Sequence, residues 1–288
     1  MARALGGGLV MAVALGAGTA LGPALADIAG VGGLPARLIP AALVTALAVP
    51  LIFRLASPGS LGFGSVARSA RAFLTGAGVT ATAAALVLGA GTAGGMLHWG
   101  RPDLASLTGF LLSNTAVAFL LEALPEETTL RGHTWTSLRE RFGATASALL
   151  TTAIFLLVPG VASVVHAAVA RLIGDEPGPV GLAPDGQNPV DYLILLTVFG
   201  LMLVAARTAL AGAPLWAGIG AHLTFLTVNR IVLEGNERDA GWPVEQMTPD
   251  VVLLVPAYVL VAAAGFVVCG RITRRGSWAK REYRRSHH

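Results

Sequence analysis

Residues 104–132 read LASLTGFLLSNTAVAFLLEALPEETTLRG, an apolar run that ends in two adjacent carboxylates, Glu126 and Glu127, with Arg131 shortly after them. A bilayer core about 30 Å thick is crossed by a helix of roughly 20 apolar residues. Residues 104–124 supply such a run, and similar runs lie at 5–25, 36–53, 73–97, 144–170, 190–209, 211–233 and 250–270. The sequence therefore predicts about eight transmembrane helices.

The composition supports this interpretation. Of the 288 residues, 54% are hydrophobic and 12% are charged, and the mean hydropathy is +0.69. These values lie far from those of soluble proteins. Neither a soluble domain nor an internal repeat is apparent, so residues 1–288 are predicted to form a single all-α polytopic domain in one bundle. A single cysteine, Cys269, excludes an internal disulfide and a cysteine metal cluster.

The distribution of basic residues predicts the orientation in the membrane. Loops rich in Lys and Arg stay in the cytoplasm. The segment 54–72 and the tail 271–288 are basic, whereas the loops 171–189 and 234–249 are mainly acidic. We therefore expect a multi-pass protein of the cell membrane with both termini in the cytoplasm. The net charge of +4 sits mostly in the tail, which favours anionic lipid over nucleic acid as its partner.

The first apolar segment has two interpretations. Arg3, the apolar stretch and the small residues Ala24-Leu25-Ala26 before Asp27 resemble a cleavable signal peptide. A retained first helix is the alternative, and it is the one we favour. The topology of the later segments is the same in both cases.

The segment Leu124-Pro125-Glu126-Glu127 predicts the start of a new helix that runs to about Arg141. Proline suits the first turn of a helix, and carboxylates are favourable near the positive end of its dipole. Glu127 and Arg131 stand at i and i+4 with the acid first, which favours a side-chain pair.

Glu126 points away from that pair, toward the side of Glu122 and, roughly, His133. A buried carboxylate near the membrane suits a general base. The simpler alternative is an interfacial acid that marks the end of a helix.

His222 lies in the middle of the apolar segment 211–233, and Asn229 follows seven residues later on the same helical face. A histidine inside a membrane segment indicates a functional site. A structural hydrogen bond to a neighbouring helix is the alternative.

The run EETTLR, followed by glycine, by HTWTSLRERFG and by an apolar helix, resembles the first signature of the CAAX-protease and bacteriocin-processing (CPBP) family of intramembrane glutamate endopeptidases. The resemblance implies an eight-helix plan. It also implies that the first glutamate and the histidine of a Phe-x-x-x-His motif activate a water molecule. A later histidine, with Asn or Asp four residues on, would stabilise the oxyanion, and no metal would be needed.

The resemblance covers residues 122–230 and is incomplete. Phe155 matches the second motif, but Pro159 replaces the expected histidine. The run PLWAGIGAH matches the third motif and supports His222. Leu226 occupies the position four residues later, so Asn229 is the nearest substitute.

These observations lead to a first hypothesis, a peptide hydrolase whose cavity opens to the cytoplasm. In it Glu126 is the general base, Glu127 positions Arg131, and His222 and Asn229 stabilise the oxyanion. His133 or His222 would stand in for the missing histidine. The substrate would be a peptide or protein segment at the membrane. No cofactor is expected, although a metal is not excluded.

Two alternatives remain open. The first is a non-catalytic relative that binds peptide or protein partners, because Pro159 cannot accept a proton. The second is a proton-coupled membrane transporter that uses the same buried acids and His222. The sequence lacks a His-Glu-x-x-His zinc motif, a Gly-x-Ser-x-Gly elbow and a phosphate-binding loop. Zinc protease, serine hydrolase and nucleotide-driven pump are therefore disfavoured.

Overall fold

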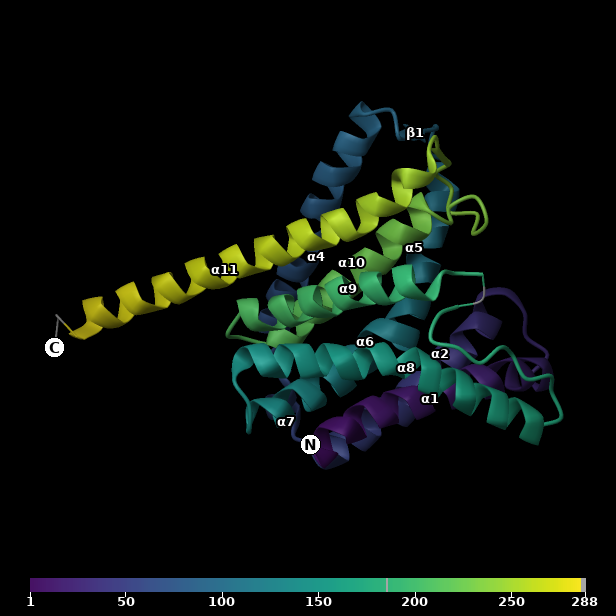
Figure 1. The fold of residues 1–288 in the computed structure, drawn as a ribbon, viewed down its shortest axis with the longest axis horizontal. Coiled ribbons are helices and arrows are strands. Elements are labelled where there is room, and N and C mark those ends of the chain that lie inside the picture. Colours follow the sequence, from purple (N-terminus) through teal and green to yellow (C-terminus); the bar gives the residue numbers. More distant parts are fainter. Residues whose placement is uncertain (185, 286–288) are drawn as a thin grey trace.

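The computed structural model describes residues 1–184 and 186–285, with side chains up to residue 274. Helices dominate the fold (Figure 1). The α-helices are α1 (Ala2–Ile28), α2 (Gly33–Leu55), α3 (Pro58–Leu61), α4 (Val66–Ala93), α5 (Leu104–Ala118), α6 (Leu124–Glu126), α7 (Trp135–Arg139), α8 (Ala144–Leu172), α9 (Pro189–Ala209), α10 (Pro214–Val232) and α11 (Leu254–Arg285). Two π-helices, η1 (Phe119–Ala123) and η2 (Glu127–Thr134), a 3-10 helix η3 (Pro249–Leu253) and the strands β1 (Leu97–Trp99) and β2 (Val244–Gln246) complete it.

The prediction of a multi-pass helical membrane protein is confirmed. Each of the eight apolar segments forms a helix. Within the described residues, seven helical stretches are long and apolar enough to cross a membrane. The remaining segment forms α10, which has 19 residues and carries His222, Asn229 and Arg230. Polar side chains at these positions lower its hydropathy below that of its neighbours.

The predicted new helix start at Leu124 is wrong. One helical stretch runs without a break from Leu104 to Arg139. The Leu124 amide donates to the carbonyl of Phe119, five residues earlier, as in a π-turn. Proline lacks an N–H and crowds the preceding turn of an α-helix. A wider π-turn directly before Pro125 lets the helix continue through it.

The start of this long helix is fixed by Asp103. Its carboxylate accepts hydrogen bonds from the Ser106 hydroxyl and from the amides of Ser106 and Ala105. The Ser106 hydroxyl, followed by these two amides, holds the pKa of Asp103 below its usual range. Asp103 thus caps α5 as a charged acceptor.

Small residues allow the helices to approach closely. A side chain at Gly76 of α4 would collide with the Ala217 carbonyl of α10, and one at Gly220 of α10 with the Phe73 carbonyl of α4. Close backbone contacts of this kind hold helices together in membranes. They fix α10, the helix of His222, against α4.

Helix α1 is an integral layer of the bundle, because it packs on α2, α8 and η2. Its Gly7 faces the Thr134 hydroxyl and the Thr129 carbonyl with no room for a Cβ. The Thr134 hydroxyl donates to the Ala4 carbonyl over 2.9 Å. Residues near the start of the chain therefore support the helix that carries the two glutamates.

A short two-stranded sheet joins the loop 234–249 to the loop between α4 and α5. β1 pairs with β2 in antiparallel register, with Leu97 opposite Gln246. The rings of Trp99 and Trp242 lie 4.9 Å apart beside it. These strands were not predicted, but their pairing places both loops at the same end of the bundle.

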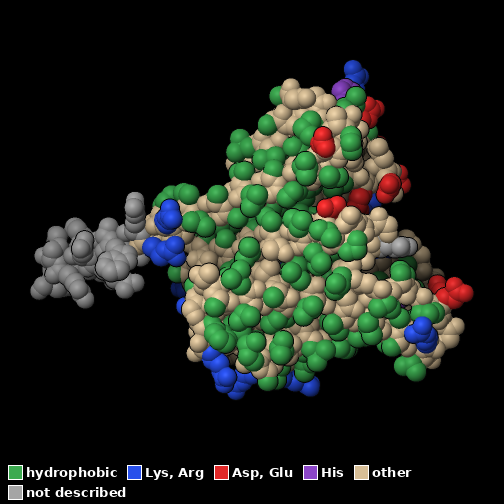
Figure 2. All heavy atoms as spheres, viewed as in Figure 1, with side chains coloured by type: hydrophobic (Ala, Val, Ile, Leu, Met, Phe, Trp, Pro, Cys, Tyr) green, Lys and Arg blue, Asp and Glu red, His purple; other side chains and the backbone are tan. Residues whose placement is uncertain are grey.

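Charge is distributed unevenly over the surface. In Figure 2 most Lys and Arg side chains gather toward the N-terminus and the far part of α11, and most acidic ones lie at the other end. This segregation agrees with the loop charges used above, while the orientation in the membrane stays a prediction. The basic tail beginning at residue 271 continues α11 as a helix to Arg285 and extends beyond the bundle (Figure 1).

Candidate active site

Glu127 is the centre of a buried cluster formed by η2 and α10. One of its oxygens, Oε1, lies 3.3 Å from Arg131 Nη1 and 3.2 Å from His222 Nδ1. The side chains of Glu127 and Arg131 are fully buried, and that of His222 is 3% exposed. The predicted pair of Glu127 with Arg131 is confirmed. The contact of His222 with Glu127 was not anticipated.

Three local features allow this cluster to form. Gly218 on α10 leaves space for Glu127, because a Cβ there would lie 2.5 Å from Oε2. Arg131 is covered by the Phe155 ring of α8, with 4.5 Å from its guanidinium carbon to the ring centre. Cations favour the face of an aromatic ring. His222 meets the Phe199 ring of α9 edge-on, with centroids 5.0 Å apart.

The contact with Glu127 sets the hydrogen positions on His222. An ionised carboxylate only accepts hydrogen bonds. A neutral His222 facing Glu127 through Nδ1 therefore carries its hydrogen on Nδ1, and Nε2 remains available. A protonated His222, stabilised by the carboxylate, presents a second donor at Nε2. Glu127 thus orients the imidazole for proton transfer or hydrogen-bond donation.

Several atoms of this cluster lack hydrogen-bond partners within the described residues. They are Oε2 of Glu127, the guanidinium nitrogens of Arg131 and the hydroxyl of Thr128, which follows Glu127 in η2. The contact of Arg131 with Glu127 is therefore an ion pair without good hydrogen-bond alignment. Buried polar groups without partners are rare and costly in folded proteins. The cluster is therefore distinguished by several buried polar atoms that have no partner among the described residues.

Glu126, the neighbouring acid, differs from Glu127. It is 9% exposed, and its carboxylate has no hydrogen bond or ion pair with any residue that the structure describes. It is the neighbour in sequence of Glu127, whose carboxylate contacts His222. The two adjacent glutamates thus have different environments. Glu127 contacts Arg131 and His222, whereas Glu126 has no partner among the described residues.

The other two predicted site residues make contacts with α1 and α11. His133 Nε2 contacts the Arg3 carbonyl of α1 at 3.2 Å. Asn229 accepts a hydrogen bond of 2.7 Å from the Tyr258 hydroxyl of α11. Both side chains therefore bind neighbouring helices. Pro159 lies inside α8, one turn beyond Phe155.

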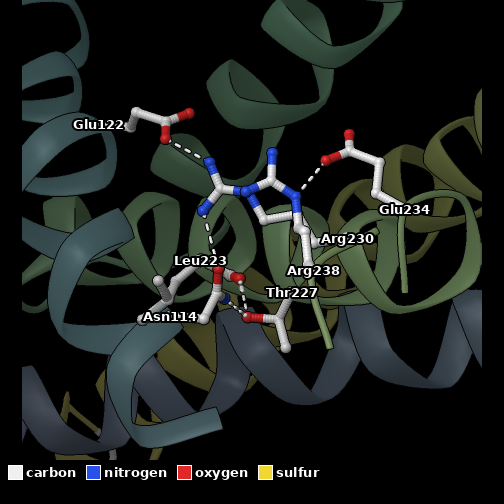
Figure 3. A network of polar contacts seen from close by, with 7 residues as sticks. All are labelled: Asn114, Glu122, Leu223, Thr227, Arg230, Glu234 and Arg238. Carbon is white, nitrogen blue, oxygen red and sulfur yellow. Dashed lines mark hydrogen bonds and ion pairs between the residues drawn. The ribbon is translucent and has the colours of Figure 1, made fainter. Parts of the chain in front are cut away.

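Sequence reasoning missed a second polar network, shown in Figure 3. Arg230 donates to Glu122 over 2.5 Å and to Asn114 over 2.9 Å. Asn114 in turn donates to Thr227 over 3.2 Å. The sequence did offer a signal for this network, because Glu122 and Arg230 each lie within a predicted apolar segment. Tyr192 of α9 was missed as well, and it lies within electrostatic range of Glu126 and Glu122.

The residues on the two sides of Glu126 differ in exposure. Residues 127–135, on the side toward α7, are all buried. On the other side of Glu126, residues 119–122, 195–198 and 226–231 are half-buried. The chain is therefore less buried on this side of Glu126 than on the side toward α7. Among the described residues, no group of three or more His, Cys, Asp or Glu side chains is arranged to hold a metal ion.

The fold and the site define a polytopic helical membrane protein with a buried Glu-Arg-His cluster between two of its helices. Residues 108–228 match the family model described as type II CAAX prenyl endopeptidase, Rce1-like. This match confirms the family resemblance, and its range contains Glu126, Glu127, Arg131 and His222. The family is one of membrane proteases. No curated protein and no solved structure matches the chain.

Proposed function

We propose that this protein is an intramembrane endopeptidase of the CAAX-protease type that hydrolyses peptide bonds with a water molecule activated by Glu126. The proposal rests on one observation, which is that the two adjacent acids have different environments. Glu127 is fully buried between Arg131 and His222. Glu126 has no partner of its own among the described residues and is the direct neighbour in sequence of Glu127, which contacts His222.

The reaction begins with proton transfer from water to Glu126, while the water oxygen attacks the peptide carbonyl carbon. General-base catalysis of this kind contributes about 10²- to 10⁴-fold in rate. The carbonyl oxygen becomes an oxyanion, and His222 donates a hydrogen bond to it from Nε2. Glu127 holds Nδ1 of the imidazolium. The C–N bond then breaks, and the proton on Glu126 passes to the leaving amine.

Because Pro159 replaces the expected histidine, the proposed catalytic groups of this chain differ from those that the family resemblance implies. No histidine follows Phe155 by four residues, and the Phe155 ring covers Arg131. Glu126 therefore acts without a histidine from α8. Asn229 is bound to Tyr258, and its support of His222 is indirect. We expect a slow enzyme for these reasons.

The substrate is a peptide or protein segment near the membrane surface. We further propose that the protein resides in the cell membrane with both termini in the cytoplasm, as the basic segments favour. The mechanism requires no metal, and a chelator tests that part of the proposal.

The test is peptide cleavage by purified protein in nanodiscs, read by mass spectrometry on a mixed peptide library. Wild type is compared with Glu126→Gln and His222→Ala, with and without chelator. Glu140→Gln, which changes an exposed acid of the same chain, is the matched control. We expect loss of cleavage in the first two variants, full cleavage in the control, and no effect of the chelator.

Cleavage that persists in Glu126→Gln would overturn the assigned base. Well-folded wild type that cuts no peptide, in a library that an active relative does cut, would favour the second candidate, a non-cutting relative that binds peptide. Pro159 is the observation that favours this second candidate. Proton-coupled solute uptake without cleavage would instead indicate a transporter.

A further inference from the structure

The network of Glu122 and Arg230 connects the two helices that supply the candidate catalytic groups. Glu122 belongs to η1, four residues before Glu126 on the same helical stretch. Arg230 belongs to α10, eight residues after His222. Their side chains form an ion pair of 2.5 Å. This contact therefore joins the helix of Glu126 to the helix of His222, in addition to the contact of Glu127 with His222.

The pair is reinforced at a second point along the same helices. Arg230 uses its other terminal nitrogen to donate to Asn114, and Asn114 donates to Thr227 (Figure 3). Asn114 is 1% exposed. The planar guanidinium of arginine suits two simultaneous acceptors in fixed directions. Contacts at Glu122 and Asn114, two turns apart, resist both sliding and rotation of one helix against the other.

The burial of this pair makes it stronger than a surface ion pair. The side chains of Arg230 and Glu122 are 15% and 22% exposed. Surface pairs between mobile side chains contribute little because water screens them. A partly buried pair with further hydrogen bonds holds a defined geometry. The distance from His222 to Arg230 along α10 is about 12 Å, so the pair acts near the site without entering it.

We propose that the ion pair of Glu122 and Arg230 is a positioning element of the active site, which sets the alignment of Glu126 with His222. The inference rests on the proposed function. Arg230 touches neither the substrate nor the reacting atoms. Its effect passes through the relative placement of the two helices, where small displacements of reacting groups change rates strongly.

The test uses the peptide identified in the cleavage experiment and separates kcat from KM. Arg230→Met removes the charge at similar length, Arg230→Lys keeps the charge without the planar fork, and Glu122→Gln removes the acid. The matched control is Arg238→Met, which breaks a neighbouring ion pair with Glu234 whose side chains are 39% exposed. Thermal unfolding of each variant reports whether it is folded.

We expect Arg230→Met to lower kcat about 10- to 100-fold with KM changed less than about threefold. Arg230→Lys should recover part of this loss. Combining Glu122→Gln with Arg230→Met should cost little more than Arg230→Met alone, because both changes break one interaction. Arg238→Met should stay within about twofold of wild type.

Different failures are distinguishable. Folded Arg230→Met with wild-type kcat, or a loss no larger than that of Arg238→Met, would overturn the positioning role and leave the proposed function intact. If Arg230→Met does not fold, the kcat values of Arg230→Lys and Glu122→Gln decide, and wild-type values in both would overturn the inference. A wild type that cuts no peptide overturns the proposed function and this inference together.

Discussion

Two regions of the molecule contain an acid followed four residues later by arginine, and they differ sharply. Glu127 and Arg131 are fully buried in η2, next to His222. Glu234 and Arg238 lie in the loop after α10, with side chains 39% exposed (Figure 3). Spacing brings both pairs together. Burial decides what each pair does, because a charge away from water depends on its partner and an exposed one does not.

The largest expected effect comes from breaking the buried pair. Arg131→Met leaves the Glu127 carboxylate buried beside His222 without its cation. Removing one partner of a buried pair lowers the free energy of unfolding by about 3–5 kcal/mol. Thermal and denaturant unfolding in detergent measures this change.

The control for that prediction removes both charges. Glu127→Gln combined with Arg131→Met should be less destabilised than Arg131→Met alone, because no unpaired charge remains. A loss below about 1 kcal/mol in Arg131→Met would show that burial does not separate the two regions.

A smaller effect is expected from crowding the buried acid. In Gly218→Ala the new methyl group would lie 2.5 Å from Glu127 Oε2. Glu127 is held by Arg131 and His222 and cannot move without weakening those contacts. We expect a loss of about 1–3 kcal/mol in the free energy of unfolding, together with reduced cleavage.

Gly78→Ala is the matched control for Gly218→Ala, because no atom lies within 4 Å of a Cβ at this position of α4. Alanine there should leave stability unchanged or raise it by about 0.5–1 kcal/mol, as in other helix interiors. Equal effects of the two substitutions would contradict the close fit of Glu127 against α10.

The smallest effect is expected at the exposed pair. Arg238→Met should change the free energy of unfolding by less than about 0.5 kcal/mol, because solvent screens both charges. Unfolding curves at low and high salt provide the measurement. A loss above about 1 kcal/mol would mean that this loop contributes more than its exposure indicates.

The helices could be predicted from sequence because the hydropathy of a membrane span is a strong local signal. Every predicted segment became a helix, but the stretches Leu104–Arg139 and Leu254–Arg285 run well past the predicted ends at 124 and 270. The prediction of a helix start at Leu124 was wrong because a π-turn before Pro125 lets the helix continue through the proline. The strands β1 and β2 have three residues each and leave no periodic pattern to detect.

Of the candidate site, only the contact between residues of the same helix could be predicted from the sequence. The pair of Glu127 with Arg131 followed from spacing within one helix. The contacts of His222 with Glu127 and of Arg230 with Glu122 join residues that are far apart in sequence. Spacing within a helix carries no information on which residue of another helix it meets. The contact of His133 with the Arg3 carbonyl of α1 also joins distant residues and was not predicted.

The small sheet has a mechanical consequence for the site. β1 directly precedes α5, and β2 follows α10, so the ladder links the helices that carry Glu126 and His222 at the end of the bundle where the two strands lie. The two helices are thus joined at one end by the ladder and nearer the site by the ion pair of Glu122 with Arg230. Two separate links therefore fix the spacing of the two helices.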